Sequence, residues 1–230
     1  MTDPDLHGGP FGPGSITRYR VHGVDFDTVR VPPGRFVDGE GASKRTLLVS
    51  RPFELGVTLV TQALWRAVTG ASPSRFAGDD RPVEQVSWDD AQAFLGQLSI
   101  LGLPGFRLPT EAEWAWAARC GVVTRWAGAD RVESVAVVGR NESALVGGLQ
   151  CSAVGGLDLS GNVRGWHQDR WSSTPVVGVD THGPASGSGR VDRGGSWFFV
   201  PKVARVAVRN CVPPVVLSYD LGVRLLRSAL

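Results

Sequence analysis

The sequence of 230 residues predicts a mixed α+β fold with a small, twisted antiparallel sheet, flanking helices and long irregular loops. Three observations support this prediction. Three helices with defined capping residues lie in the first half, short strand-like segments lie toward both ends, and a glycine-rich stretch with recurring tryptophans fills much of the second half. The apolar fraction of 42% is ample for a folded core in a chain of this length.

The amino-terminal segment, residues 1–15, is rich in glycine and proline and is expected to be a flexible tail ahead of a single domain over residues 16–230. It lacks the apolar stretch of a Sec signal peptide, and no apolar run reaches the length that spans a membrane. The location is otherwise unknown, so a cytoplasmic protein without a membrane segment is the default expectation.

Strand-like segments are expected on either side of the helices. In the first half they cover Ile16 to Val31, where Pro32-Pro33-Gly34 interrupts the pattern, and Leu47 to Leu55. In the second half they cover Gly189 to Asp192, Val203 to Val208 and Gly222 to Leu226. These segments are short, which indicates a small sheet.

Three helices are predicted from their capping residues. The expected helices are Gln62 to Val68 after Thr61, Ala91 to Leu98 after Ser87, and the segment from Thr110 to Gly121. Thr110 with Glu113 forms a capping box, and Ser87 with Asp90 comes close to one. Between Val122 and Gly195 no helix or strand period is sustained, so long loops anchored by buried aromatic side chains are expected there.

The charge pattern argues against a nucleic-acid partner. The formal net charge is +2, and the basic residues are scattered among acids instead of forming a stripe. The cysteines, Cys120, Cys151 and Cys211, show neither a zinc-site spacing nor a disulfide framework. His167 lies near Asp169, but no nucleophile accompanies them, so His167 is expected to pack beside Trp166.

Sequence blocks that span most of the chain after about residue 30 occur in the order typical of one family. The blocks are Val57-Thr58, Thr61–Trp65, Pro73–Phe76, Arg81–Ala91, Arg107–Trp114, Gly156–Val163, Arg193–Trp197 and Leu221–Leu225. Together they resemble the formylglycine-generating-enzyme (sulfatase-modifying factor) family. The resemblance implies the C-type-lectin-like fold of that family, with a core sheet, flanking helices and long loops.

The resemblance does not extend to the catalytic cysteines of that family. The oxidase works through a pair of cysteines shortly after the Gly-Gly-Ser-aromatic motif, which bind copper. Here the corresponding segment, Phe198 to Arg205, contains no cysteine, and Cys211 lies alone further on. Because a lone soft ligand is a poor copper site, no catalytic residue, metal or cofactor is expected.

Two other metal sites of related proteins are not expected either. Related sulfoxide synthases bind iron through helically spaced histidines, whereas the histidines of this chain are isolated. The resemblance also implies a calcium site around Asp158 and the carbonyls of Gly161 and Val163, with a glutamate two residues beyond. Gly165 stands at that last position, so the charge that a hard cation needs is lost. A tight turn at Gly161-Asn162 under Trp166 is expected instead.

The segment from about residue 198 to 220 departs from the family in an interleaved way. Family-like residues persist at Pro201, at 204–207, at Arg209, at Pro214 and at 221–222, but the positions between them are changed. The changed residues are of kinds that can arise from asparagine codons. This pattern resembles the variable region of proteins diversified by diversity-generating retroelements, in which adenines of such codons are randomised.

The expected ligand-binding residues are those of this variable region. They are Phe198, Phe199, Val200, Val203, Val208, Asn210, Cys211, Val212, Pro213, Val215, Val216, Ser218, Tyr219 and Asp220. The proline-rich run 212–217 does not suit a central strand, so exposure is expected at Val212, Val215, Ser218 and Tyr219. Phe198 and Val203 fit exposure and burial equally well. Arg205, Arg209 and Asp220 are expected to ring an apolar patch of the kind found in interaction surfaces.

Two functional hypotheses from different classes follow. The first is a non-catalytic binding protein whose diversified C-terminal surface meets an unknown macromolecular ligand, with a protein as the favoured class. The second is a divergent copper-dependent formylglycine-generating oxidase that acts on sulfatase cysteines and uses Cys211. The absence of a cysteine pair favours the first hypothesis.

Overall fold

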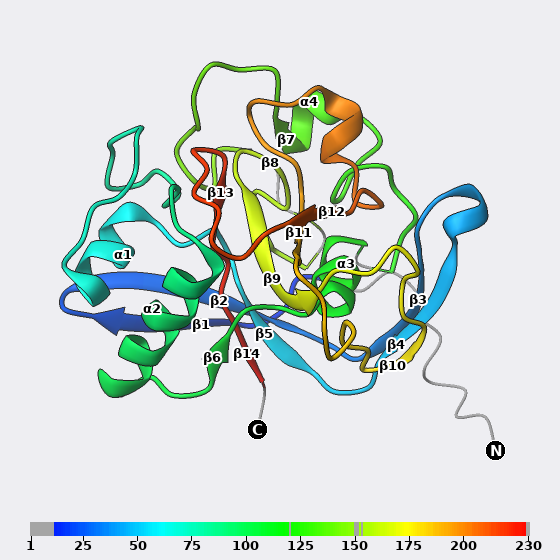
Figure 1. Cartoon of the computed structure of the whole chain (residues 1–230), viewed down its shortest axis with the longest axis horizontal. Helices are drawn as coiled ribbons and strands as arrows, with labels where there is room; N and C mark the ends of the chain where they lie inside the picture. The colour runs from blue at the N-terminus through cyan, green and yellow to red at the C-terminus, as the bar shows by residue number, and fades with distance from the viewer. Residues whose placement is uncertain (1–11, 120, 150–151, 153, 229–230) are drawn as a thin grey trace.

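The computed structural model describes residues 12–119, 121–149, 152 and 154–228 (Figure 1). Most of the expected flexible tail, residues 1–11, lies outside this part of the chain. The remainder of that tail is hydrogen-bonded to later segments. The N–H group of Gly14 donates to the carbonyl of Val154 at 3.1 Å, and the carbonyl of Ser15 accepts from Arg30 at 2.9 Å.

An antiparallel sheet of five strands joins the two ends of the described chain. In spatial order its strands are β1 (Ile16–Val21), β2 (Val24–Val31), β5 (Phe53–Gly56), β14 (Leu226–Ser228) and β6 (Phe106–Arg107). The single strand expected over 16–31 is wrong. His22 and Gly23 both adopt positive φ angles, as a two-residue hairpin turn requires, so the chain reverses between β1 and β2.

The capping residues correctly predict the three main helices, α1 (Gln62–Thr69), α2 (Trp88–Ile100) and α3 (Glu111–Arg119). The hydroxyl of Thr61 accepts from the N–H of Leu64 at 3.2 Å. Ser87 and Thr110 both form full capping boxes. Helix α2 therefore begins directly after Ser87, earlier than expected. A further short helix, α4 (Val132–Val135), lies in the irregular region.

A second sheet contains β3 (Gly34–Asp38), β4 (Arg45–Val49) and β10 (Gly178–Val179), in the order β10-β4-β3. A short 3-10 helix, η2 (Gly41–Ser43), connects β3 to β4. The single strand expected over 47–55 is wrong, because the chain passes from this sheet to the five-stranded one at residues 50–52. Pro52 cannot donate a hydrogen bond to a strand ladder, which suits a break at that position.

A third sheet carries the C-terminal segment. Its strands, in spatial order, are β12 (Asn210–Val212), β11 (Arg190–Arg193), β9 (Arg164–Arg170) and β13 (Leu221–Gly222). The patterns along the sequence missed β9, which lies at the centre of the molecule (Figure 1). The pair β7 (Ala136–Val137) and β8 (Ser160–Gly161) is separate. The strand expected over 203–208 is wrong, since a 3-10 helix, η3 (Pro201–Ala204), precedes irregular chain there.

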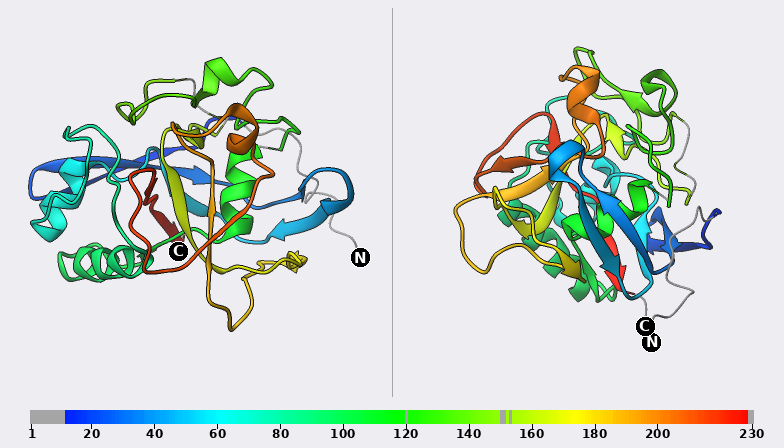
Figure 2. Two further views of the ribbon diagram at one scale, coloured as in Figure 1. Left: turned by 45° about the horizontal axis from the view of Figure 1, so that its top comes forward. Right: turned by 90° about the vertical axis from the view of Figure 1, so that its right-hand side faces the viewer.

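Buried tryptophans anchor the irregular second half, as expected. The indole N–H of Trp166, on β9, donates to the carbonyl of Val86 at 2.9 Å. The indole N–H of Trp126 donates to the carbonyl of Pro201, also at 2.9 Å. The Trp166 contact ties β9 to the segment just before α2, and the Trp126 contact joins two irregular segments of the second half, which cover one side of the central strands (Figure 2).

Candidate ligand-binding face

The segment 198–220 runs across the outside of the third sheet, drawn from orange to red in Figure 1. We call its solvent-accessible side chains the C-terminal face. The predicted residues among them that are mainly exposed are Phe198, Val200, Cys211, Pro213 and Val215. Those that are half-buried are Phe199, Val203, Val208, Asn210, Val216, Ser218 and Tyr219. Phe198, which the sequence left open, is 56% exposed, and Val215 is 71% exposed.

The backbone under this face is held by hydrogen bonds to loops from elsewhere in the chain. The carbonyl of Phe199 accepts from the N–H of Gly139 at 2.9 Å. In the distal part of the segment the carbonyl of Pro214 accepts from Trp88 at 2.8 Å, and that of Ser218 accepts from Gln85 at 2.9 Å. The main chain is therefore fixed by partners that do not depend on the identity of the exposed side chains.

Buried side chains alternate with the exposed ones along the segment. Ala204 and Val206 are fully buried, and the N–H of Val206 donates to the carbonyl of Arg125 at 2.9 Å. Gly195, just before the segment, has a positive φ angle, and a Cβ atom there would lie 2.6 Å from the Cα atom of Ala204. The family-like residues Ala204 and Val206 thus attach the segment to the interior, while changed residues such as Phe198, Val200 and Val215 face solvent.

An aromatic cluster forms one end of the C-terminal face. The ring of the buried Trp197 lies 5.7 Å from the ring of Phe198 and 5.7 Å from that of Tyr219. Phe76, from the loop after α1, meets Trp197 edge-to-face at 5.3 Å. The rings of Phe198 and Phe199 lie 5.5 Å apart. Such a cluster offers large, rigid contact area at low cost in side-chain entropy.

Two of the predicted binding residues do not face solvent. Val212 is only 9% exposed, because β12 pairs with β11 and turns this side chain toward the core that contains Trp166. Asp220 is buried between two chain segments and forms an ion pair with Arg164 at 3.0 Å. The expected exposure of Val212, and the expected place of Asp220 in a rim around the patch, are both wrong.

Conversely, three accessible residues of this region were missed. Leu217 is 58% exposed and lies between two predicted positions. Leucine is a residue type that can arise from asparagine codons, so Leu217 fits the pattern of its neighbours although it was not among the predicted residues. Arg75 and Phe76 were missed for a different reason, because they come from a distant part of the sequence and reach the face only in the folded chain.

Beneath the face lies a buried ionic cluster that sequence patterns did not reveal. Asp38 pairs with Arg45, Arg119 and Arg193 at 3.0–3.1 Å. Glu111 pairs with Arg45 and Arg193 at 3.1 and 3.2 Å and also with Arg209. Arg209 is therefore committed to the interior instead of to the rim.

The carboxylates of this cluster are held ionised. Burial alone would raise the pKa of Asp38, but the three surrounding guanidinium groups outweigh it and lower that pKa to about 2. Burial opposes ionisation of Glu111 as well, and Arg193 and Arg209 lower its pKa below the ordinary value. Both groups carry negative charge at neutral pH and neutralise part of the buried arginine charge.

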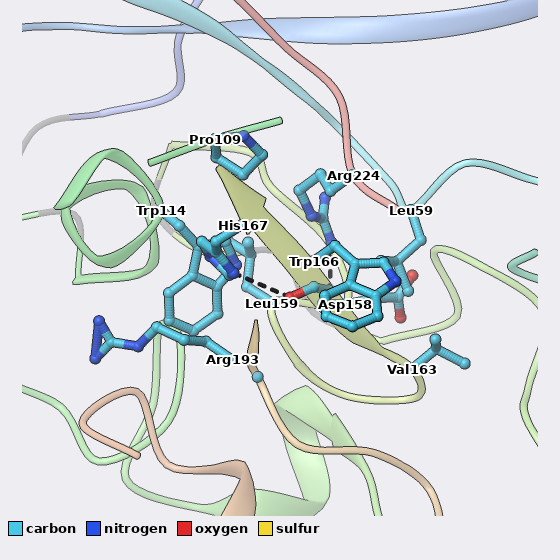
Figure 3. A pocket seen from close by; sticks show the side chains of 12 residues that line it. Leu59, Pro109, Trp114, Asp158, Leu159, Val163, Trp166, His167, Arg193 and Arg224 are labelled. Atoms are coloured by element: carbon cyan, nitrogen blue, oxygen red, sulfur yellow. Dashed lines mark hydrogen bonds between the residues drawn. The ribbon is translucent and has the colours of Figure 1, made fainter. Parts of the chain in front are cut away.

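The interior behind β9 contains a small pocket lined by Trp114, Asp158, His167, Arg193 and Arg224 (Figure 3). The ring of His167 packs edge-to-face against that of Trp114, at 5.6 Å. Burial and the nearby Arg193 lower the pKa of His167 to about 3, so its imidazole is neutral. Arg224 is fully buried and donates to main-chain carbonyl groups, including that of Gly56 at 2.7 Å. These side chains act in packing and support.

The residues around Asp158 form hydrogen bonds within the chain. The carboxylate of Asp158 accepts from the N–H of Gly147 at 2.7 Å. The turn expected at Gly161-Asn162 is present, and both residues have positive φ angles. The side chain of Asn162 bonds both main-chain groups of Ala144. Within the described residues no group of three or more His, Cys, Asp or Glu side chains could hold a metal ion.

The donor set needed for copper does not fit this face. The first side chains after the Gly194-Gly195-Ser196-Trp197 motif are phenylalanine, phenylalanine and valine. Cys211 is a free, exposed thiol on the edge strand β12. Copper in proteins is held by several soft or imidazole ligands, and those segments supply a single thiol.

Comparison with known proteins gives concordant results. Residues 19–229 match the sulfatase-modifying factor enzyme 1-like domain. The solved structure of Treponema denticola variable protein 1 resembles this one with a TM-score of 0.87 and 31% identity, covering 93% of this chain and 99% of that one. This likeness confirms the predicted C-type-lectin-like α+β fold.

Two proteins related to this chain by sequence are named as a chaperone and as an enzyme. The chaperone protein LppX of Paenibacillus barcinonensis is 27% identical over an alignment of 261 positions, gaps included, that covers 89% of this chain and 90% of that protein. A formylglycine-generating enzyme of Streptomyces coelicolor is 33% identical over an alignment of 194 positions, gaps included, that covers 74% of this chain and only 60% of the enzyme. In the described residues, no helix is long and apolar enough to cross a membrane.

Proposed function

Since the chain belongs to the sulfatase-modifying factor enzyme 1-like family, we propose that it is a non-catalytic member that binds a ligand through a C-terminal face diversified by a diversity-generating retroelement. The observation that carries this proposal is the alternation along residues 198–220. Exposed side chains such as Phe198 and Val215 alternate with buried ones such as Ala204 and Val206. A surface built in this way can change its side chains without losing its backbone.

The likeness to Treponema denticola variable protein 1 supports the proposal from a second direction. That protein is variable by name, and the likeness extends over nearly the full length of both chains. At 31% identity this is also a likeness in sequence. We infer that the segment 198–220 is the variable part of this chain, within one domain over residues 16–230.

The ligand that suits this face is a protein. Phe198 and Tyr219 supply rigid aromatic anchors, and the exposed Val200, Val215 and Leu217 add apolar area along the same segment. Aromatic anchors with smaller neighbours are the composition of paratopes and of the central part of protein interfaces. Shallow apolar surfaces of this kind meet another macromolecule more readily than they enclose a small molecule.

A pair of display libraries tests the proposal. In the first library the codons of Phe198, Val200, Val215 and Leu217 are randomised on the surface of yeast. In the matched control library, the buried positions Ala204, Val206 and Leu221 are randomised instead. We expect the first library to be displayed at the wild-type level and to yield binders against a panel of purified proteins. We expect the control library to lose display, because substitutions there disrupt the core.

Equal loss of display in both libraries would contradict the proposal, as would a first library that yields no binder. The coding DNA offers an independent test. We expect a near-identical template repeat that differs from the 198–220 coding region only at adenines, with a reverse transcriptase gene nearby. Differences spread over all bases would exclude this source of diversity.

The enzymatic alternative rests on relatives such as the Streptomyces coelicolor enzyme. It is tested by incubating the copper-treated protein with a cysteine-containing sulfatase peptide and measuring the peptide mass. We expect no conversion of cysteine to formylglycine, because one exposed thiol, Cys211, stands on the face. Conversion that disappears in the variant Cys211→Ser would establish the enzyme and refute the binding proposal.

A further inference from the structure

The C-terminal face is continued by two residues from outside the segment 198–220. Arg75 and Phe76 belong to the loop between α1 and α2, more than a hundred positions earlier in the chain. The guanidinium carbon of Arg75 lies 5.4 Å from the ring centroid of Tyr219 and 5.6 Å from that of Phe76. Arg75 is exposed and therefore lies beside the aromatic cluster at the surface.

The loop that carries these residues is held in place by buried polar side chains. Glu84 is fully buried, and its Oε1 atom accepts from the N–H of Phe76 at 2.9 Å. The side-chain amide of Gln62 donates to the carbonyl of Phe76 at 2.8 Å, and its Oε1 accepts from Gly78 at 3.0 Å. The main chain on the C-terminal side of Arg75 is thus fixed before any ligand arrives, which lowers the entropy lost on binding.

The guanidinium group of Arg75 has unused hydrogen-bonding capacity. Contact with an aromatic ring through its flat face leaves the N–H groups in the guanidinium plane, where they can meet a carboxylate with two parallel hydrogen bonds. Some exposed arginines have such partners, since Arg18 pairs with Asp27 and Arg66 pairs with Asp79, whereas others, such as Arg35, form no ion pair with a described carboxylate. Within the part of the chain that the structure describes, no carboxylate oxygen forms a close ion pair with Arg75, and the buried Glu84 attracts it only from a greater distance.

We propose that Arg75 is a fixed contact residue of the binding face and that it binds an aspartate or glutamate side chain of the protein ligand. This inference rests on the proposed function and deepens it, because it adds a constant element to a face whose other contacts change. Phe76 and Tyr219 hold the guanidinium in position. An exposed arginine held beside aromatic rings resembles the residues that contribute most to protein interfaces.

A peptide selection tests the inference. A phage-displayed library of random peptides is selected on the wild-type protein and on the charge-reversal variants Arg75→Glu and Arg35→Glu. Arg35 is the matched control, since it is an exposed arginine on β3, away from the C-terminal face in Figure 1. We expect peptides rich in Asp and Glu from the wild type and from Arg35→Glu, and peptides rich in Lys and Arg from Arg75→Glu.

The dissociation constants of individual peptides give the second readout. We expect Arg75→Ala to weaken acidic peptides about tenfold and Arg35→Ala to leave them unchanged. Equal enrichment of acidic peptides on all three proteins, with capture abolished by Phe198→Asp, would overturn the role of Arg75 while sparing the proposed function. A selection in which no peptide depends on Phe198 or Val215 would contradict the proposed function itself.

Discussion

The C-terminal face and the ionic cluster beneath it are built from opposite kinds of contact. On the face, side chains such as Val215 and Phe198 point to solvent, and the backbone supplies the fixed contacts. In the cluster, Asp38 and Arg193 depend on one another through side chains that are almost fully buried. From this difference we expect side chains on the face to be replaceable without loss of stability and side chains in the cluster not to be.

The largest test of this comparison is the substitution Arg193→Met. It removes a buried cation that pairs with both Asp38 and Glu111, so both buried carboxylates lose one of their charged hydrogen-bonding partners. We expect a loss of about 3–5 kcal/mol in the free energy of unfolding, measured by urea denaturation. Arg193→Lys keeps the charge and serves as the control, with a smaller loss. Wild-type stability in Arg193→Met would show that the cluster does not constrain the fold.

Acid should weaken the cluster and spare the face. The pKa of Asp38 is about 2 in the folded chain against an ordinary value of 3.8, so its contribution to stability is present above about pH 4 and disappears as pH falls toward 2. We expect this carboxyl to account for on the order of 2 kcal/mol of the acid-induced loss.

Urea unfolding at a series of pH values checks the size of the loss, and ¹³C NMR titration of the Asp38 carboxyl checks its source. The variant Val215→Ser is the control, because it should follow the same pH profile as the wild type. If Asp38 titrated near pH 4, as an ordinary aspartate does, the cluster could not account for the acid-induced loss of stability.

The smallest expected effect belongs to the face. Val215→Ser changes a side chain that is 71% exposed, and we expect a change of less than about 0.5 kcal/mol in the free energy of unfolding. The matched substitution Val206→Ser, at a fully buried position of the same segment, should cost about 1–3 kcal/mol. Thermal melting of the two variants beside the wild type measures both. A large loss at Val215 would undo the division between the two regions.

The helices could be predicted from local signals in the sequence, whereas the buried ionic cluster depends on long-range contacts and could not. Thr61, Ser87 and Thr110 cap helices through bonds to residues only three positions away, so short sequence windows contain the information. The cluster joins Asp38 to Arg193, which are 155 residues apart, and no pattern along the chain records that distance.

Within the candidate site, too, the exposure of a side chain could be predicted only where it does not depend on long-range contacts. The interleaving of changed and family-like residues located the segment 198–220, and Val215 is exposed as expected. Val212 was misplaced because its burial depends on the pairing of β12 with β11. Arg75 and Phe76 were missed because only folding brings their loop to the face. Strand β9 escaped detection because the polar residues His167 and Asp169 are buried by the fold, so the strand shows no simple alternation of apolar and polar residues.

The order of strands at the end of the chain has a consequence for how such a protein tolerates coding errors. β13 and β14 follow the proposed variable segment, residues 198–220, and β14 lies between β5 and β6 inside the five-stranded sheet. A frameshift or premature stop within residues 198–220 therefore deletes a strand that the N-terminal half of the protein needs for its own hydrogen bonding. Chains with such errors would fail to fold and be degraded. Only chains translated in the correct frame to the end of β14 would then display the C-terminal face.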